Sequence, residues 1–321
     1  MRVLVVGGAG YIGSHVVYEL LRDGKEVMVF DNLSTGHREF VPDKVKFYLG
    51  DITVKEDLVN VFKQEKIDIV MHFAGKIRVD ESVSKPLMYY YNNVEGLRIL
   101  LEVMEEFKVK NIVFSSSAAV YGEALNGVCF EDDHKLPINP YGETKLIGER
   151  LIESTYLAHG INYVIFRYFN VAGADSSLEI GLKSKLITHL IPKAIDVALT
   201  EGSKLKVFGN DYNTKDGTCI RDYIHVTDIA KAHVLGAYHL IDGKDSNVFN
   251  LGSNSGYSVL EVINEVNNVI PVEYEVAERR DGDPAVLIAN AERAKTVLNW
   301  KITKDLNEMI KSDLNYRRKV K

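Results

Sequence analysis

Cysteine is nearly absent from this chain of 321 residues, which has only Cys129 and Cys219. Two cysteines cannot form a framework of several disulfides, so we expect a protein of the reducing cytoplasm. Long apolar runs are absent too, because none reaches the roughly 18 residues that a membrane-spanning helix needs. The first apolar stretch, Val3–Val6, meets glycines at once and is too short for a signal peptide.

Positive charge is not in excess. The chain has 39 Lys and Arg against 45 Asp and Glu, which gives a formal net charge of −6. This balance argues against a general nucleic-acid binder, because such proteins carry a basic surplus. Proline is scarce as well, with only 7 residues, and no proline-rich linker divides the chain. Hydrophobic residues make up 46% and charged residues 26%, so a chain of this length can bury a large core.

Short apolar runs alternate with helical patterns throughout the first half of the sequence. The predicted strands are Arg2–Val6, Glu26–Phe30, Val45–Leu49, Ile69–His72, Asn111–Phe114 and Asn162–Phe166. The predicted helices are Tyr11–Arg22, Leu58–Lys66, Leu87–Phe107 and Tyr141–His159. Such alternation is typical of a parallel sheet covered by helices on both faces. We therefore predict an α/β fold with a Rossmann-type doubly wound parallel sheet.

The alternation loosens after about residue 171. We predict a Rossmann domain over residues 1–171 and a smaller C-terminal α/β substrate-binding domain over residues 172–321. Within the second half, Val226–Ile241 has the pattern of a helix and Val248–Leu251 that of a strand. A helix followed by a strand can extend a parallel sheet, so we expect residues 226–252 to return to the first domain.

Gly7, Gly10 and Gly13 form a G-x-x-G-x-x-G motif between the first predicted strand and the first predicted helix. Asp31 follows at the end of the second strand. This is the context of a dinucleotide-binding fingerprint: the glycines allow a tight turn and close approach of a pyrophosphate, and the helix N-terminus offers N–H groups to phosphate. Asp31 can accept hydrogen bonds from ribose hydroxyls and would repel a 2′-phosphate, so we predict NAD rather than NADP.

Two further strand ends fit the same site. Asp51–Ile52 follows the third strand, where an adenine would lie, and Phe73–Gly75 follows the fourth, where small residues let a cofactor pass. Each alone is equally typical of an ordinary turn at a strand end.

Tyr141 and Lys145 stand four residues apart at the start of a predicted helix, a spacing that places both side chains on one face. A phenol with a pKa of about 10 is a poor base at neutral pH, but a nearby ammonium and a cationic nicotinamide lower that pKa. Ser115–Ser117 ends the strand before this helix, at the edge where open α/β sheets bind ligands. We predict Tyr141, Lys145 and Ser117 as catalytic residues, although spacing alone leaves a chance pair open among 17 tyrosines.

With these motifs the chain resembles the extended short-chain dehydrogenase/reductase superfamily and, within it, the UDP-glucose (UDP-galactose) 4-epimerases. The resemblance covers essentially the whole chain. Motifs shared across the superfamily are Val6–His15, Asp31–Leu33, His72–Gly75, Ser115–Gly122 and Tyr141–Lys145. The more specific motifs are Arg167–Asn170, Gly209–Tyr212, Asp216–Thr218, Arg221–Val226 and Arg279–Asp283.

The resemblance implies a mechanism in which Tyr141 removes the proton of the sugar 4-hydroxyl while hydride passes from carbon 4 to tightly held NAD. The 4-keto sugar then turns over and takes hydride back on its other face. The implied cofactor contacts are Gly7, Gly10, Tyr11, Ile12, Gly13, Asp31, Asn32, Asp51, Ile52, Phe73, Ala74, Gly75, Asn92, Ser115, Tyr141, Lys145 and Tyr168. The implied UDP-sugar contacts are Ser117, Tyr141, Asn170, Leu190, Phe208, Arg221, Arg280, Asp283 and Leu287. It also implies a homodimer built on the helices Leu87–Phe107 and Tyr141–His159.

Three departures from related families bear on the chemistry. Dehydratases of the superfamily carry Asp-Glu where this chain has Ala118-Ala119, which disfavours elimination of water. The usual lysine after Phe-Ala-Gly is displaced by one position in Lys76-Ile77-Arg78. Leu287 stands where some strict UDP-glucose/galactose enzymes have Tyr, and its smaller side chain leaves room for an N-acetyl group.

Several alternatives therefore stay open. One is a UDP-N-acetylglucosamine 4-epimerase or a dual-specificity enzyme. Another is an NAD-dependent nucleotide-sugar oxidoreductase that releases its NADH, and a third is an NAD-binding regulator without catalysis. The 9 histidines show no spacing typical of metal ligands, so we expect no metal.

Overall fold

Seven strands form the main sheet of the computed structural model, which describes residues 1–124, 126–184, 187–279 and 284–320. The strand order is β11-β7-β5-β4-β1-β2-β3, and the pairs from β5 to β3 are all parallel. The order runs outward from β1 to one edge and from β4 to the other, so the predicted doubly wound α/β sheet is confirmed. The strands are β1 (Arg2–Val6), β2 (Glu26–Asp31), β3 (Lys46–Leu49), β4 (Ile69–His72), β5 (Asn111–Ser117), β7 (Asn162–Tyr168) and β11 (Asn247–Leu251).

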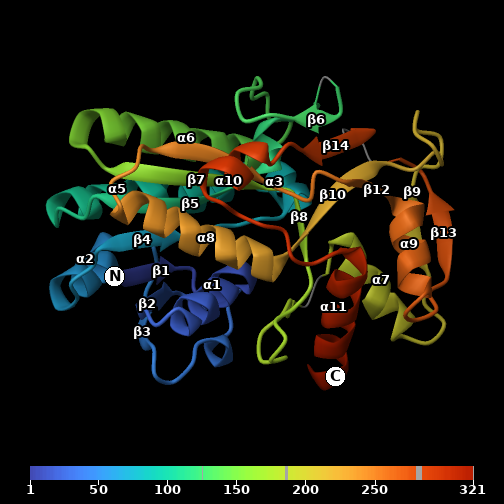
Figure 1. Ribbon diagram of the computed structural model, residues 1–321, viewed down its shortest axis with the longest axis horizontal. Helices are drawn as coiled ribbons and strands as arrows, with labels where there is room; N and C mark the ends of the chain where they lie inside the picture. Colours follow the sequence, from blue (N-terminus) through green and yellow to red (C-terminus); the bar gives the residue numbers. More distant parts are fainter. Residues whose placement is uncertain (125, 185–186, 280–283, 321) are drawn as a thin grey trace. The chain divides into compact units, whose positions relative to one another are not determined.

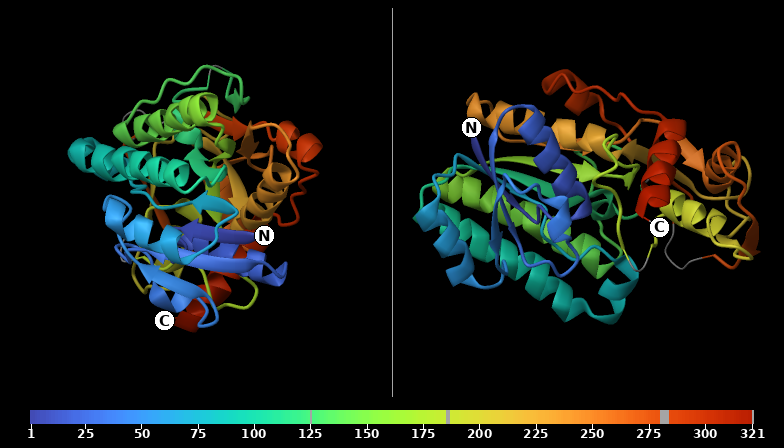
Figure 2. Two further views of the ribbon diagram at one scale, coloured as in Figure 1. Left: turned by 90° about the vertical axis from the view of Figure 1, so that its left-hand side faces the viewer. Right: turned by 90° about the horizontal axis from the view of Figure 1, so that it is seen from below.

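Helices cover both faces of this sheet (Figures 1 and 2). On one face lie α1 (Tyr11–Arg22) and α8 (Val226–Ile241), where the Tyr238 hydroxyl donates a hydrogen bond to Asp23 at the end of α1. On the other face lie α2 (Lys55–Gln64), α5 (Gly96–Glu106) and α6 (Pro140–His159). Met28, Leu100 and Ile165 belong to the apolar core beneath this second group. Burial of these side chains from strands and helices alike holds the layers together.

The helix predicted over Leu87–Phe107 contains an irregular turn. It begins as α4 (Pro86–Tyr89), passes through the π-helical segment η2 (Tyr90–Glu95) and continues as α5. A π-helical turn inserts a residue into the helical repeat and is frequent at functional sites. The apolar periodicity of the sequence predicts the helix but not this insertion.

The chain divides into two compact units at other points than residue 171. The first unit comprises Met1–Gly122, His134–Arg167 and Ala230–Phe249, and the second comprises Glu123–Asp133, Tyr168–Ile229 and Asn250–Lys321. The segment Glu123–Asp133, predicted within residues 1–171, belongs to the second unit because β6 (Val128–Cys129) pairs with β14 (Val286–Ala289).

The second unit has two small sheets and its own core. One sheet joins β12 (Gly256–Ser258), β10 (Ile220–His225), β14 and β6, with β8 (Asn170–Ala172) beside β10. The other pairs β9 (Leu205–Phe208) with β13 (Tyr274–Ala277). Its helices are α7 (Leu190–Ala198), α9 (Val259–Asn267), α10 (Glu292–Val297) and α11 (Leu306–Val320), of which α7, α9 and α11 contribute Ile195, Ile263 and Ile310 to the core. Among the residues described, no helix is long and apolar enough to cross a membrane.

Candidate active site

The glycine-rich loop lies where the strand order of the main sheet reverses, between β1 and β4. Gly7 has a φ of +83°, and a Cβ at this position would lie 2.4 Å from the backbone nitrogen of Ala74. A Cβ on Gly13 would lie 2.2 Å from the carbonyl oxygen of Gly7. Gly10 then caps α1 with no side-chain hydrogen bond. The loop therefore exposes backbone and a helix N-terminus at a switch point, the arrangement that binds a pyrophosphate.

Polar residues at the ends of β2 and β3 gather beside this loop. The Asp31 carboxylate accepts hydrogen bonds from the backbone N–H of Ala9 at 3.0 Å and of Leu33 at 2.8 Å. Burial raises the pKa of Asp31, and these two hydrogen bonds oppose the rise. The Asn32 amide donates to the Asp51 carboxylate at 2.8 Å. Three of the predicted cofactor residues thus lie together, because Asp31 precedes Asn32 in the chain and Asn32 is hydrogen-bonded to Asp51.

The end of β4 connects the glycine loop with the predicted catalytic helix. The backbone N–H groups of Phe73 and Ala74 both donate to the Val6 carbonyl, at 2.7 and 3.1 Å. A Cβ on Gly75 would lie 3.7 Å from Nζ of Lys145. Ile52 differs from these residues, because its side chain is buried in the core under α5.

Helix α6 positions Tyr141 and Lys145. Asn139 caps it by accepting a hydrogen bond from the Gly142 N–H at 2.9 Å, and Pro140 occupies the first turn. The Lys145 ammonium donates to the Ser115 carbonyl at 2.8 Å and lies 5.1 Å from the centre of the Phe114 ring. Burial lowers the pKa of Lys145 to about 8.

Ser117 at the end of β5 connects to the tyrosine. Its hydroxyl oxygen accepts a hydrogen bond from the Ala119 N–H at 3.2 Å. Burial raises the pKa of the Tyr141 phenol, and a hydrogen bond from Ser117 acts in the opposite direction. The structure therefore brings the three predicted catalytic residues together at the carboxyl edge of the sheet.

Three of the residues predicted to contact the substrate come together in the second unit. Arg221 on β10 stands opposite Leu287 on β14, and the Asn170 amide on β8 donates to the Asp222 carbonyl at 3.0 Å. Phe208 ends β9 and Leu190 begins α7, so these two lie on other elements of that unit. Arg280 and Asp283 lie outside the described residues. Tyr168 is buried at the end of β7.

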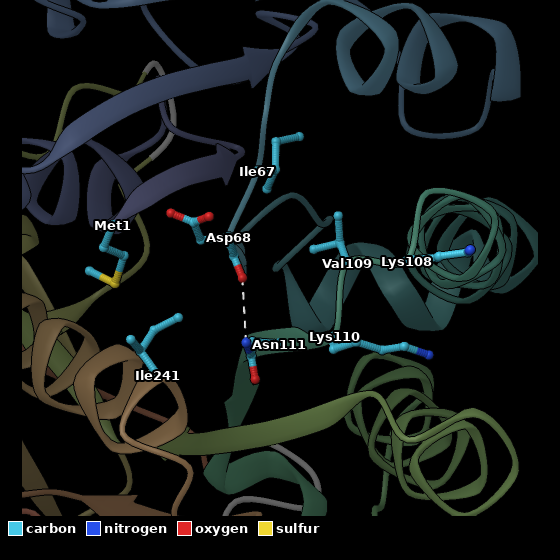
Figure 3. A pocket seen from close by; sticks show the side chains of 8 residues that line it. All are labelled: Met1, Ile67, Asp68, Lys108, Val109, Lys110, Asn111 and Ile241. Atoms are coloured by element: carbon cyan, nitrogen blue, oxygen red, sulfur yellow. Dashed lines mark hydrogen bonds between the residues drawn. The ribbon is translucent and has the colours of Figure 1, made fainter.

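A separate hollow of about 460 Å³ lies at the opposite edge of the main sheet (Figure 3). Its lining comes from the amino ends of strands and their neighbours: Met1, Ile67, Asp68, Lys108, Val109, Lys110, Asn111 and Ile241. None of the predicted catalytic or cofactor residues lines it. Ligands of open α/β sheets bind at the carboxyl ends of the strands, so we assign no catalysis to this hollow. No group of three His, Cys, Asp or Glu in the described part of the chain is arranged to hold a metal ion.

Comparison with known proteins identifies the family. The family model described as "NAD dependent epimerase/dehydratase family" matches residues 3–252. This chain belongs to the NAD-dependent epimerase/dehydratase family. A relative named UDP-glucose 4-epimerase from Lactobacillus helveticus is 49% identical, over 94% of this chain and 92% of its own length.

Two solved structures extend the family comparison. The UDP-glucose 4-epimerase of Bifidobacterium longum, in complex with NAD+ and UDP, has a TM-score of 0.92 and 40% identity, covering 99% of this chain and 98% of its own. The UDP-Glc/GlcNAc 4-epimerase of Campylobacter jejuni has a TM-score of 0.87 and 39% identity, covering 99% of each chain.

This member of the NAD-dependent epimerase/dehydratase family has buried polar residues at the site to which the sequence patterns assign no role. Asn93 in η2 accepts from the Lys76 N–H at 2.8 Å and donates to the Lys76 carbonyl at 3.0 Å and to Thr144 at 3.1 Å. It therefore ties the segment after β4 to α6. The predicted Asn92 donates to the Asn93 side chain at 3.0 Å. The sequence did contain a signal for this position: Asn93 is a second asparagine directly after Asn92, and the helix that follows it buries apolar residues.

His72 is the second such residue. It ends β4, is buried, and stacks on Phe114 with ring centres 5.7 Å apart. Burial, with a contribution from the nearby Lys145 charge, lowers the pKa of His72 to about 3, so its ring is neutral. A polar residue at the end of the apolar run Ile69–Met71 was the signal for this position.

Proposed function

We propose that this protein is a UDP-glucose 4-epimerase that interconverts UDP-galactose and UDP-glucose with tightly bound NAD. The observation that carries the proposal is the hydrogen bond between Ser117 and Tyr141, with Lys145 one turn later on α6 bound to the Ser115 carbonyl, beside a glycine loop that admits no side chain at Gly7 or Gly13. The family and the names of its closely similar members support the same activity. Their names also support NAD as the cofactor and a UDP-sugar as the substrate.

The first unit has the residues to hold NAD. The N-terminus of α1 and the backbone around Gly7 and Gly10 suit a pyrophosphate. Asp31 keeps lone pairs free beyond its two backbone hydrogen bonds, so it can accept from ribose hydroxyls. The absence of a side chain at Gly75, where a Cβ would lie 3.7 Å from the Lys145 Nζ, suits the part of the cofactor nearest the chemistry. When bound, NAD supplies a reversible acceptor for hydride.

Tyr141 is the group proposed to move the proton. Its phenol must lose its own proton before it can accept that of the sugar 4-hydroxyl, and burial alone opposes this. The hydrogen bond from Ser117 favours the phenolate. As a general rule a cation nearby does the same, and this is the role proposed for Lys145 one helical turn away. The proton leaves the sugar oxygen for Tyr141 Oη as carbon 4 is oxidised, and it returns when carbon 4 is reduced on its other face. Ala118 and Ala119 offer no group that could protonate a leaving hydroxyl, so elimination is not expected.

The second unit is proposed as the UDP-sugar domain. Arg221 suits a diphosphate, while Asn170, Phe208 and Leu190 contribute polar and apolar contacts. Arg280, Asp283, Tyr168 and Asn92 keep the roles that the family resemblance implies. Leu287 beside Arg221 also favours a second candidate, epimerisation of UDP-N-acetylglucosamine. The name of the Campylobacter jejuni neighbour supports this candidate, since it includes both sugars.

We also propose a homodimer in the cytoplasm. Leu87 at the start of α4 is 83% exposed and Leu157 near the end of α6 is 82% exposed, so each presents an apolar side chain that the proposed partner would cover. Cys129 and Cys219 are both buried and are not joined in a disulfide, as suits a reducing compartment. Sedimentation equilibrium on wild type and on a Leu87→Glu, Leu157→Glu double variant tests the assembly. A wild-type monomer would contradict it.

Tyr141→Phe is the direct test of the proposed activity. The purified variant should keep its NAD and its fold but lose kcat on UDP-galactose by at least about 100-fold, because general acid–base catalysis contributes that much or more. Tyr156→Phe, an exposed change on the same helix, is the matched control and should be active. Undiminished activity of Tyr141→Phe would refute the assigned base. Net accumulation of NADH by the wild type would favour the oxidoreductase alternative instead.

A further inference from the structure

A buried ion pair lies directly beneath the catalytic helix. The Arg167 guanidinium on β7 donates to both carboxylate oxygens of Glu149 on α6, at 2.9 and 2.6 Å. The two side chains are each 2% exposed. The third arm of Arg167 donates to the Tyr121 hydroxyl at 2.9 Å. Such a pair is poor evidence for stability, because desolvation offsets most of its attraction.

The same carboxylate also holds the strand that carries the catalytic serine. The Ser116 hydroxyl donates to Glu149 at 2.5 Å. Its neighbours in the chain are Ser115, whose carbonyl accepts from Lys145, and Ser117, which bonds Tyr141. Glu149 and Lys145, one turn apart on α6, thus bind two consecutive residues of β5, Ser116 and Ser115. The catalytic tyrosine lies on the same helix one turn earlier.

We propose that Glu149 is a positioning residue for the reaction, whose carboxylate fixes the end of β5 against α6 and faces the Lys145 ammonium from one helical turn away. The inference rests on the proposed function, because it gives Glu149 a task only if Lys145 and Tyr141 perform theirs. The hydrogen-bond partners of the Glu149 carboxylate are Ser116 and Arg167, neither of which belongs to the glycine loop or to the proposed substrate residues. It acts through Ser116 and through its charge.

The charged groups around Lys145 determine how removal of the Glu149 carboxylate changes the pKa of Lys145. His72 is the titratable group that faces Lys145 from β4, and it is neutral. Burial lowers the pKa of Lys145, and Glu149 is the charge that raises it again. Around Glu149 itself stand Arg167 from β7, Tyr121 after β5, and Glu153 further along α6. Without the carboxylate, Lys145 keeps its proton over a narrower pH range.

Glu149→Gln is the variant that tests this. It keeps the size of the side chain and removes the charge, so the pKa of Lys145 should fall. The alkaline limb of the pH profile of kcat should therefore move to lower pH by about half a unit or more. The KM for UDP-galactose should change less than 2-fold, because Glu149 has no proposed contact with the substrate. Glu149→Asp keeps the charge and should restore the position of the alkaline limb. Glu153→Gln, half-buried one turn further along the same helix, is the matched control and should leave the profile unchanged.

Two outcomes with the single variants would overturn the inference. One is a folded, NAD-containing Glu149→Gln variant with the wild-type pH profile, and the other is an equal shift in Glu153→Gln. If Glu149→Gln does not fold, the double variant Glu149→Gln, Arg167→Met leaves no unpaired buried charge. It should still shift the limb to lower pH, and an unshifted limb overturns the inference equally. Absence of UDP-galactose turnover in the wild type would refute the proposed function, which distinguishes that failure from this one.

Discussion

Replacement of Gly13 by alanine tests whether the loop between β1 and α1 is shaped for a bound cofactor. The added Cβ would lie 2.2 Å from the carbonyl oxygen of Gly7, whereas ordinary contacts begin at 3.4 Å. The atom in its way is backbone and cannot rotate aside, so the start of α1 must move from the loop by about 1 Å, a displacement that is large for a preorganised site. Overpacking of this kind costs about 1–3 kcal/mol of folding free energy.

The larger effect should be on NAD. A displaced helix N-terminus loses at least one hydrogen bond to a charged phosphate, worth about 1.5–3 kcal/mol, which weakens binding by about 10- to 150-fold. The assay is the amount of nucleotide released from the purified protein by acid, together with the Kd for added NAD. Denaturant unfolding of the same samples reports folding separately.

Gly24→Ala is the matched control for that variant. Gly24 has a φ of +68°, but no atom lies within 4 Å of its Cβ position. The change strains the backbone by about 1–2 kcal/mol without moving the loop, so it should lower stability and leave NAD content intact. Wild-type NAD affinity in Gly13→Ala would refute the assignment of this loop as the phosphate site.

Two further predictions concern specificity and pH. Leu287→Tyr fills the space beside Arg221, so kcat/KM for UDP-N-acetylgalactosamine should fall about 10-fold or more relative to UDP-galactose, and parallel losses on both sugars would contradict this. Lys145→Met should stabilise the NAD-free protein at pH 7 by up to about 3 kcal/mol, because the folded pKa of about 8 lies below the ordinary 10.5 and folding there buries a charge. As pH rises from about 8 to 10.5 the unfolded lysine keeps a proton that the folded one loses, so wild type gains stability and the advantage of the variant fades. Urea unfolding of both proteins across that range measures it, and a constant difference would count against the buried ammonium.

The sequence predicted those elements whose ends are determined by residues close to them in the chain. Helix α6 begins at Pro140, after its cap Asn139, and ends before Gly160, whose φ is +64°, so both ends follow from residues next to them in sequence. The same holds for the catalytic residues, because Tyr141 and Lys145 are related by one helical turn and Ser117 by its place at a strand end.

What escaped prediction depends on partners far away in the chain. The segment around Val128 joins the second unit because it pairs with Ile288, and no local periodicity reports that pairing. β5 is longer than its apolar run because it continues through Ser115–Ser117. The Ser116 hydroxyl in this extension is hydrogen-bonded to Glu149 on α6. Glu149 and Arg167 are ordinary charged residues in the sequence, and only the fold brings them into contact. Ile52 was predicted from its position after β3, but the approach of Gly96 on α5 places its side chain in the core.

The discontinuous first unit has a consequence for how this chain is made on the ribosome. β7 is the sixth strand of the main sheet to be synthesised, and its outer neighbour β11 is encoded about 80 residues later. At a synthesis rate of roughly 5–20 residues per second, β7 has no partner on that side for roughly 4–16 s. An unpaired strand edge recruits other chains. Aggregation through β7 therefore competes with folding during each round of translation, and slower translation over residues 169–246 lengthens the interval of risk.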